Sequence, residues 1–414
     1  MMSIETYLEN FRLHHGNDLF ASSAPKTIVD EVCPEGYKIP RFINEFWTSS
    51  QRQGHSLHEI SYRACFKAEL PRFFIELLTR PNELVYDPFM GRGTTLLEAS
   101  LLCKRVAGND VNPLSRILIE PRLNPPELAK IHERLHSIPW DGKEKSEIDL
   151  SMFYSPSTEK NIVVLKKYLI KRKASGSEDM VDKWIRMVAT NRLTGHSSGF
   201  FSVYSLPPNQ AVSPVAQKKI NEKRRQTPPD RDVISIVEKK SWDLQKDLTN
   251  QQRNNLHQTA GSAKYFCQDA QDKIGLNNET VDLIITSPPF LDTVQYADDN
   301  WLRCWFNNID AREVGKKITM SRSVEDWVSV MKNVFREFIR ILKPNGWIAF
   351  EVGEVRGGKV FLDEIIAPIG IKTGFICHGI VVNVQHFTKT SQCWGIKNNL
   401  KGTNTNRIVI FQKE

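Results

Sequence analysis

The feature that most constrains this chain is residues 281–290, where an apolar run ends in Thr-Ser-Pro-Pro-Phe. The β-branched run predicts a buried parallel strand. Two prolines cannot continue that strand, because each lacks the N–H that a sheet ladder needs. We therefore expect a stiff turn at the carboxyl end of the strand, where ligands bind in open α/β sheets. Taken alone, the segment is equally compatible with an ordinary strand exit.

The groups in this turn suit one kind of ligand. The hydroxyl of Ser287 and the backbone carbonyl of Pro288 are hydrogen-bond acceptors, and Phe290 adds a flat ring beside them. Two acceptors next to an aromatic ring fit the exocyclic amino group of a planar base.

A second segment, residues 84–99, predicts a strand, a glycine-rich turn and a helix. Asp87 ends the strand, and Gly91 and Gly93 let the backbone approach a ligand. The helix opens at the following threonines, with its N–H groups toward the same ligand. It is not a P-loop, because no Gly-Lys-Ser/Thr follows. About twenty residues on, a second strand ends at Asp110, which is placed to accept hydrogen bonds from a ribose, as in dinucleotide-binding folds.

Together the two segments resemble the amino-methylating DNA methyltransferases, which use S-adenosyl-L-methionine. Residues 87–95 are similar to their cofactor motif and residues 286–290 to their catalytic motif. The resemblance covers residues 60–120 and 263–414. It implies an α/β fold, a class I (Rossmann-like) methyltransferase sheet, interrupted here by a large, mainly helical basic insertion. It also implies double-stranded DNA as substrate and a cognate restriction endonuclease as a potential partner.

The resemblance assigns individual residues to the cofactor. Residues 66–71 are similar to the segment that touches the methionine end, and Asp269 to the acid that approaches the adenine. The implied cofactor-binding residues are Phe66, Lys67, Asp87, Pro88, Phe89, Gly91, Gly93, Thr94, Thr95, Asp110, Asn112, Asp269, Ala270 and Thr286.

The implied catalytic residues are Ser287, Pro288, Pro289 and Phe290. A base flipped out of the duplex would stack on Phe290 while its amine donates to Ser287 and Pro288. In this family Ser-Pro-Pro turns are associated with cytosine N4, and Asp- or Asn-Pro-Pro turns with adenine N6. The expected target is therefore cytosine N4, with adenine N6 as the alternative. The sequence identifies no acceptor for the proton that the amine loses.

Several classes of protein and site are not expected. No run of 18 apolar residues exists, so we expect no membrane span. The N-terminus lacks a basic region followed by an apolar one, so we expect no secretory signal and a cytoplasmic, nucleoid-associated protein. The seven cysteines form no Cys-x-x-Cys pair, and we found no ligand spacing among the ten histidines. We therefore expect reduced thiols and no metal.

The positive charge is concentrated in one part of the chain. The whole chain has 56 Lys and Arg against 48 Asp and Glu, and residues 121–262 alone have 24 against 16. The remainder is therefore neutral, and a basic segment beside a neutral catalytic unit suits binding to a phosphate backbone. A solvated basic surface is the alternative interpretation.

The expected organisation has four parts. Residues 1–60 form a partly helical N-terminal extension, 61–120 and 263–414 the two halves of the methyltransferase domain, and 121–262 the basic insertion, a possible DNA-recognition domain. Hydrophobic spacing predicts helices and strands in these parts. The helices are expected at 70–78, 128–135, 158–172, 178–191, 216–225 and 328–342, and the closing strands at 375–384 and 407–411.

Two surfaces of the insertion are expected to meet nucleic acid. The loop at 194–210, which carries Phe200, Phe201 and Tyr204, is expected to read or wedge bases. The phosphate contacts are expected from one cationic helical stretch, Lys218, Lys219, Lys223, Arg224 and Arg225. Because an insertion at this point departs from the common order of the family, it could instead contact backbone only, dimerise or clamp RNA.

Two other functions stay open. A similar glycine-rich turn and a Pro-Pro turn occur in enzymes that methylate guanine N2 in tRNA, but those usually carry Asp-Pro-Pro. A DNA-binding protein on a decayed methyltransferase fold would not need Asp87, Asp110 and Ser287 together. The recognition sequence and the oligomeric state are not indicated.

Overall fold

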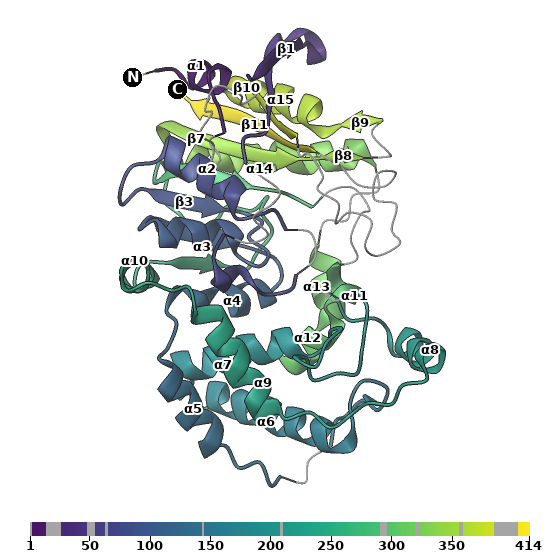
Figure 1. Ribbon diagram of the computed structural model, residues 1–414. Helices are drawn as coiled ribbons and strands as arrows, with labels where there is room; N and C mark the ends of the chain where they lie inside the picture. Colours follow the sequence, from purple (N-terminus) through teal and green to yellow (C-terminus); the bar gives the residue numbers. More distant parts are fainter. Residues whose placement is uncertain are drawn as a thin grey trace.

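The computed structural model describes residues 2–13, 26–47, 54–62, 65–142, 145–207, 210–289, 296–318, 323–355, 359–384 and 405–414. A nine-stranded sheet has helices on both faces, and a mainly helical region extends from one end (Figure 1). The strand order is β1-β2-β10-β11-β7-β6-β3-β4-β5. These strands are β1 (Ile28–Val32), β2 (Ile39–Asn44), β3 (Leu84–Asp87), β4 (Arg105–Asn109), β5 (Lys264–Phe266), β6 (Val281–Thr286), β7 (Leu342–Val352), β10 (Phe375–Val384) and β11 (Thr405–Lys413). A separate two-stranded ribbon joins β8 (Glu354–Val355) and β9 (Val360–Phe361).

The middle of the sheet has the class I methyltransferase arrangement. Strands β7, β6, β3, β4 and β5 are parallel, and β11 pairs antiparallel with both β7 and β10. The predicted Rossmann-like class I sheet is therefore confirmed. Because the five parallel strands run the same way, their carboxyl ends meet at one edge of the sheet.

Successive side chains of the strands point to opposite faces of the sheet and pack into two separate hydrophobic cores. Val85 and Leu283 belong to one core, whereas Tyr86 and Ile284 belong to the other. This period of two is expected of a sheet covered on both faces. The first core lies under α2 (Glu69–Leu78) and α3 (Thr94–Leu101), and the second under α14 (Val324–Ile341) and α15 (Leu362–Thr373).

The N-terminal residues do more than the sequence suggested. They form α1 (Ile4–Glu9) and then β1 and β2, and β2 extends the main sheet by pairing parallel with β10. The side chain of Asn383 accepts hydrogen bonds from the backbone N–H groups of Phe46 (2.7 Å) and Trp47 (3.1 Å). The sequence concealed β2 because Pro40 and Arg41 interrupt its apolar pattern.

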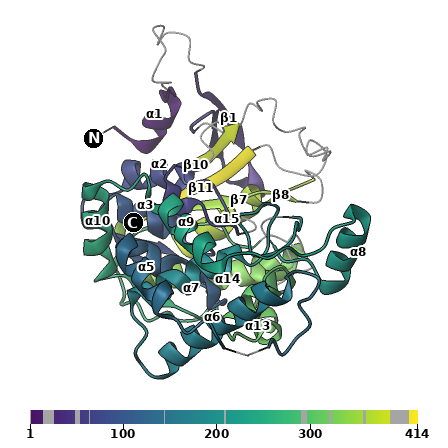
Figure 2. The same cartoon turned by 60° about the horizontal axis from the view of Figure 1, so that its bottom comes forward.

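A helical region lies between β4 and β5 in the chain and packs beyond α3 (Figures 1 and 2). Its buried side chains, Trp184 and Leu165 among them, continue the first core. Both views show α8 projecting from the rest. No helix within the described ranges is long and apolar enough to cross a membrane. The helices of this part are α4 (Leu114–Ile119), α5 (Leu128–Ser137), α6 (Pro156–Ala174), α7 (Met180–Arg192), α8 (Pro214–Arg224), α9 (Val233–Gln245) and α10 (Asn250–Ala260).

The remaining α-helices follow β6. They are α11 (Tyr296–Asp299), α12 (Trp301–Phe306) and α13 (Ala311–Lys317). Short 3-10 turns occur at Pro34–Gly36, Ser56–His58 and Glu120–Leu123. The C-terminal end of α13 places Lys317 and Ile318 at the carboxyl edge of the sheet.

Candidate active site

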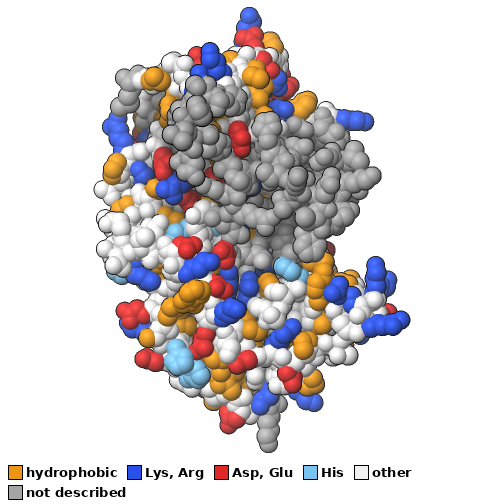
Figure 3. All heavy atoms as spheres, viewed as in Figure 1, with side chains coloured by type: hydrophobic (Ala, Val, Ile, Leu, Met, Phe, Trp, Pro, Cys, Tyr) orange, Lys and Arg blue, Asp and Glu red, His pale blue; other side chains and the backbone are white. Residues whose placement is uncertain are grey.

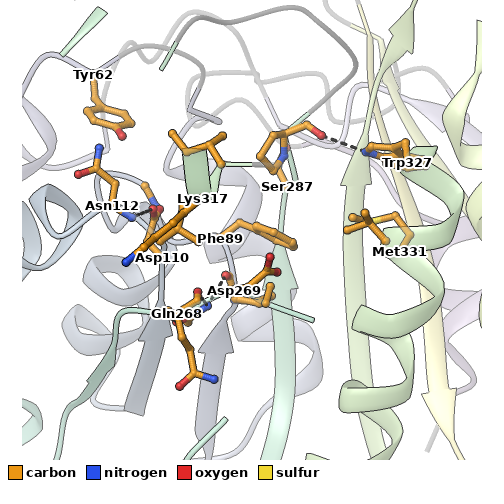
Figure 4. A pocket seen from close by; sticks show the side chains of 18 residues that line it. Tyr62, Phe89, Asp110, Asn112, Gln268, Asp269, Ser287, Lys317, Trp327 and Met331 are labelled. Carbon is orange, nitrogen blue, oxygen red and sulfur yellow. Dashed lines mark hydrogen bonds between the residues drawn. The ribbon is translucent and has the colours of Figure 1, made fainter. Parts of the chain in front are cut away.

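A cavity of about 820 Å³, including its mouth, lies at the carboxyl ends of β3, β4, β5 and β6. Ligands bind in this position in open α/β sheets. Figure 4 shows Tyr62, Asp110 and Asn112 on one side and Trp327 and Met331 on the other. The cavity is lined by Tyr62, Pro88, Phe89, Gly91, Asn109, Asp110, Val111, Asn112, Gln268, Asp269, Ala270, Ser287, Pro289, Lys317, Ile318, Trp327, Val330 and Met331.

The carboxylate of Asp110 organises the glycine-rich turn. One oxygen accepts a hydrogen bond from the backbone N–H of Gly91 (2.9 Å), and the other accepts one from the backbone N–H of Asn112 (2.8 Å). Burial raises the pKa of Asp110 even though both N–H groups act in the opposite direction. Because each carboxylate oxygen has a second lone pair, Asp110 can still accept hydrogen bonds from a ligand in the cavity.

The two glycines of the turn have different roles. Gly91 lines the cavity with a φ of +48°, a conformation that side chains disfavour. Gly93 does not line it. A Cβ on Gly93 would lie 2.6 Å from Ile119, so this glycine allows α3 to approach α4. Gly93 therefore has a packing role, and its contact with the cofactor stays a prediction.

Asp87 also lies outside the cavity lining and is fully buried. Its Oδ1 accepts hydrogen bonds from Thr286 Oγ1 (2.7 Å) and from the backbone N–H of Phe89 (3.1 Å). Burial raises the pKa of Asp87 to about 6. Asp87 thus joins the end of β3 to the end of β6. It holds the strand ends of the site in place without lining the cavity.

The Ser-Pro-Pro turn follows β6 directly. Ser287 and Pro289 line the cavity, while Pro288 is buried and does not. The indole N–H of Trp327, in the first turn of α14, donates to the carbonyl of Pro289 (3.0 Å; Figure 4). That carbonyl is therefore occupied, and the turn is fixed to a buried side chain. Phe290 lies outside the described residues.

A buried carboxylate stands behind the turn. Glu351, near the end of β7, lies close enough to Ser287 for the serine side chain to lower its pKa, and it accepts a 2.7 Å hydrogen bond from the side chain of Asn406. Burial raises the pKa of Glu351, although both side chains act in the opposite direction. Since a carboxylate only accepts, Ser287 is the donor in this pair when Glu351 is ionised.

The cavity gathers nine of the residues that the sequence singled out. They are Pro88, Phe89, Gly91, Asp110, Asn112, Asp269, Ala270, Ser287 and Pro289. Phe66 and Lys67 precede α2 and lie outside the lining, and Thr94, Thr95 and Thr286 are buried behind it. The expected contacts of these outlying residues with the cofactor stay predictions.

Several contributing residues escaped the sequence analysis. Asn109 clamps the strand ends, since its amide nitrogen donates to the carbonyls of Gln268 (3.0 Å) and Pro88 (3.3 Å). The sequence could have indicated Asn109, because it is a polar residue immediately before Asp110. It could also have indicated Glu351, because this residue is an acid within an otherwise apolar strand. No feature of the sequence indicates Trp327, because tertiary packing brings it to the site.

The cavity fits S-adenosyl-L-methionine. The side-chain nitrogen of Asn112 is buried and has no hydrogen-bond partner among the described residues, so a donor is available for a ligand. Asp110 offers acceptors for ribose hydroxyls. Phe89, Ile318 and Met331 supply an apolar lining suited to a planar base.

The predicted cationic stretch forms α8. Lys218, Lys219, Lys223, Arg224 and Arg225 are all exposed there. Lys218 lies 3.6 Å from Asp149, and the guanidinium of Arg224 lies 3.7 Å from the ring centre of Tyr204. Blue side chains crowd the projecting lobe on the right of Figure 3, in the position of α8.

Other basic residues of the helical region are engaged internally. Arg134 and Arg172 form ion pairs with the buried carboxylate of Asp182, and Lys240 pairs with Glu59. Within the described part of the chain, Lys219, Lys223 and Arg225 form no ion pair. The unneutralised charge of the region therefore includes a compact group on α8.

The aromatic loop differs from the expectation. Phe201 is fully buried and Phe200 is 6% exposed, with the guanidinium of Arg192 lying 4.0 Å from the ring centre of Phe200. The prediction that these two rings read or wedge bases is wrong, because both rings belong to the protein interior. Asn209 of this loop, and most of the polar connection at 385–406, lie outside the described residues.

Comparison with known families agrees with this geometry. A family model described as DNA methylase, of the N6 and N4 type, matches residues 18–116 and 281–414, more than half of the chain. The unmatched stretch between them contains α5 to α10.

Individual relatives match over shorter regions. The Type II methyltransferase M.MvaI of Kocuria varians is 28% identical over 120 residues, 28% of this chain and 26% of the relative. M.BsoBI of Geobacillus stearothermophilus is 24% identical over 297 residues, 63% of this chain and 55% of the relative. The chain thus spans from about a quarter to about half of these curated relatives. A solved DNA modification methylase of Thermus thermophilus, complexed with S-adenosyl-L-methionine, is 22% identical, covers 35% of this chain and 53% of its own, and has a TM-score of 0.23.

Proposed function

This chain belongs to the DNA methylase family, and we propose that it is a site-specific DNA methyltransferase that modifies the N4 of a cytosine flipped out of the duplex. One observation carries the proposal. The turn organised by Asp110 and the turn carrying Ser287 line the same cavity. A methyl donor held by the first would therefore lie beside an amine held by the second, and such proximity is a major source of rate enhancement.

S-adenosyl-L-methionine is the cofactor, and it supplies an electrophilic methyl group when bound. Asp110 accepts hydrogen bonds from the ribose hydroxyls, and the amide of Asn112 donates to the same ligand. Phe89 and the apolar side chains near it exclude water from the base. In this proposal Asp87 acts indirectly, because it fixes the positions of Phe89 and Thr286.

Ser287 receives the amine. In this proposal its Oγ donates to the nearby Glu351, which leaves the Oγ lone pairs to accept a hydrogen bond from the amine. The resemblance implies the carbonyl of Pro288 as the second acceptor. Pro288 itself lies outside the cavity lining, so this contact stays a prediction. As the methyl group is transferred, the amine loses a proton to Ser287 Oγ, while the Ser287 proton moves to Glu351. The raised pKa of Glu351 favours this last step.

Cytosine is favoured because a serine stands before the Pro-Pro pair. Ser-Pro-Pro is associated with cytosine N4 in the family that the motif resembles, and an ionised Asp is not available in this position. Adenine N6 is the alternative target, since both amines can donate to the same pair of acceptors.

We place the DNA contacts on α8. Its exposed basic residues bind backbone phosphates, which supplies affinity without sequence information. Because Phe200 and Phe201 are buried, α8 is assigned to backbone binding alone.

Transfer of a labelled methyl group from S-adenosyl-L-methionine to duplex DNA tests this function. The protein should label DNA, and Ser287→Ala should reduce the rate strongly while cofactor affinity is unchanged, because the hydroxyl acts only as the amine reorganises. Ser262→Ala, on an exposed loop after α10, is the matched control and should label DNA normally. Labelling of transfer RNA but not DNA would overturn the proposal.

A further inference from the structure

Two histidines of α5 lie four residues apart, contrary to the expectation that no histidines have a ligand spacing. His132 and His136 therefore share one face of the helix. Their ring centres are 4.2 Å apart. An imidazole pair on successive turns of a helix is a common arrangement for binding one metal ion.

A carboxylate from another helix completes the group. Glu238 belongs to α9, and its Oε1 lies 2.7 Å from His132 Nδ1 and 3.3 Å from His136 Nε2. One ligand atom from each of the three residues lies within 4.8 Å of the other two. Ligand atoms around a tetrahedral zinc ion, at about 2.0–2.1 Å from the metal, are about 3.3 Å apart, so the observed separations need only small side-chain adjustments.

We propose that His132, His136 and Glu238 bind a divalent transition-metal ion of the zinc class, which fastens α5 to α9. Two imidazoles and one carboxylate form a ligand set that zinc uses, with water in the fourth position. The side chains of the two histidines are 63% and 52% exposed, so an ion reaches them directly from solvent.

Asp232 caps the start of α9, and its side chain accepts hydrogen bonds from the backbone N–H (3.1 Å) and the hydroxyl (2.7 Å) of Ser235. A pale-blue histidine patch marks this surface in Figure 3, over the part of the molecule where Figure 1 labels α5.

The site is structural and separate from methyl transfer. In Figure 1, α5 and the labelled part of α9 lie in the helical region, away from the strands of the sheet. The two helices already pack through Ile131, Leu135 and Val237, and the ion would add a bond between their exposed faces. Because an ion that binds only the folded state stabilises it, zinc should raise the unfolding temperature of the protein.

Zinc titration of the full chain, first stripped with a chelator, tests the proposal. Calorimetry should show one zinc ion fewer bound to the double variant His132→Ala/His136→Ala than to the wild type, and weaker binding to Glu238→Gln. Exposed cysteines such as Cys33 and Cys267 are present in every variant, so zinc held by them cancels in the comparison. His257→Ala, an exposed histidine of α10, is the control and should bind as the wild type does.

Thermal unfolding provides the second measurement. Zinc should raise the midpoint for the wild type and for His257→Ala, and this rise should be lost in the double variant. Equal unfolding midpoints without zinc would show that the substitutions leave the fold intact. Equal zinc stoichiometry in the wild type and the double variant would overturn the site. An unchanged unfolding midpoint in the zinc-bound wild type would overturn the proposal that the ion stabilises the packing of α5 against α9.

Discussion

Thr286 Oγ1 donates a 2.7 Å hydrogen bond to the buried carboxylate of Asp87. The two residues are 199 positions apart in the chain, yet they lie at the ends of the neighbouring strands β6 and β3. Asp87 begins the glycine-rich turn and Thr286 immediately precedes Ser287. This bond therefore fixes the spacing between the two turns that line the cavity.

The buried charge of Asp87 predicts a pH-dependent stability. The folded-state pKa is raised to about 6 from 3.8, so the unfolded chain loses its proton first and stability falls as the pH rises through this interval. Asp87→Asn removes the charge but keeps an oxygen to accept from Thr286. The variant should therefore gain stability relative to the wild type between pH 4 and pH 6, by up to about 3 kcal/mol.

Urea unfolding of both proteins across that pH range measures the effect. Asp141→Asn, at an exposed residue of a surface turn, is a control that should follow the wild type. Parallel curves for Asp87→Asn and the wild type would show that burial of this carboxylate does not cost stability.

We expect the carboxylate of Asp110 to contribute to the affinity for the cofactor. Removing its carboxylate in Asp110→Ala should weaken S-adenosyl-L-methionine binding by about 1.5–3 kcal/mol, the range for charge-assisted hydrogen bonds. Calorimetry measures the change. Asp272→Ala, which removes an exposed carboxylate just after Asp269, should leave the affinity unchanged. A folded Asp110→Ala protein that binds as tightly as the wild type would refute this assignment.

Much of this architecture follows from sequence pattern. The apolar runs of β3, β4 and β6 and the periodic helix α14 were predictable because burial on both faces or on one face leaves a clear pattern. Asp110 and Ser287 could also be placed, since each directly follows a predicted strand. Parallel strands then bring both residues to one edge of the sheet.

Other features depend on contacts that no local pattern records. Phe200 looked like a surface aromatic because its loop is rich in glycine and serine, but tertiary packing buries it. Gly93 looked like a ligand-binding glycine, whereas its neighbour is Ile119. The hydrogen bond from Trp327 to Pro289 and the proximity of Glu351 to Ser287 involve distant segments, so only the folded chain reveals them.

We expect the ionisation of Glu351 to determine how kcat depends on pH. If it receives the proton through Ser287, Glu351→Gln should lower kcat by about 100-fold or more, as for other general bases, while KM for the cofactor is unchanged. In the wild type, kcat should rise with pH through the raised pKa of Glu351, and this limb should disappear in the variant. A purely structural role would instead leave the limb in place, whatever the loss in kcat.

The basic residues of α8 predict the salt dependence of DNA binding. Replacing Lys218, Lys219, Lys223, Arg224 and Arg225 with glutamine should weaken binding to specific and scrambled duplexes alike. The slope of log affinity against log salt should flatten by up to about 0.9 for each phosphate that the variant no longer neutralises.

A charge-matched variant controls this experiment. It replaces five exposed lysines outside α8, namely Lys130, Lys171, Lys173, Lys239 and Lys246. The net charge falls equally in the two variants, so any difference reports the location of the residues that bind phosphate. Equal salt slopes for the two would assign the effect to overall charge and remove α8 from the DNA interface.

The identity of the methylated nucleoside tests the central claim most directly. Unmodified duplex DNA is incubated with the protein and S-adenosyl-L-methionine, digested to nucleosides and analysed by mass spectrometry. We predict N4-methylcytosine, with none formed by Ser287→Ala. N6-methyladenine would correct the target while keeping the site, and DNA left unmodified by a folded protein that binds the cofactor would contradict the proposed function.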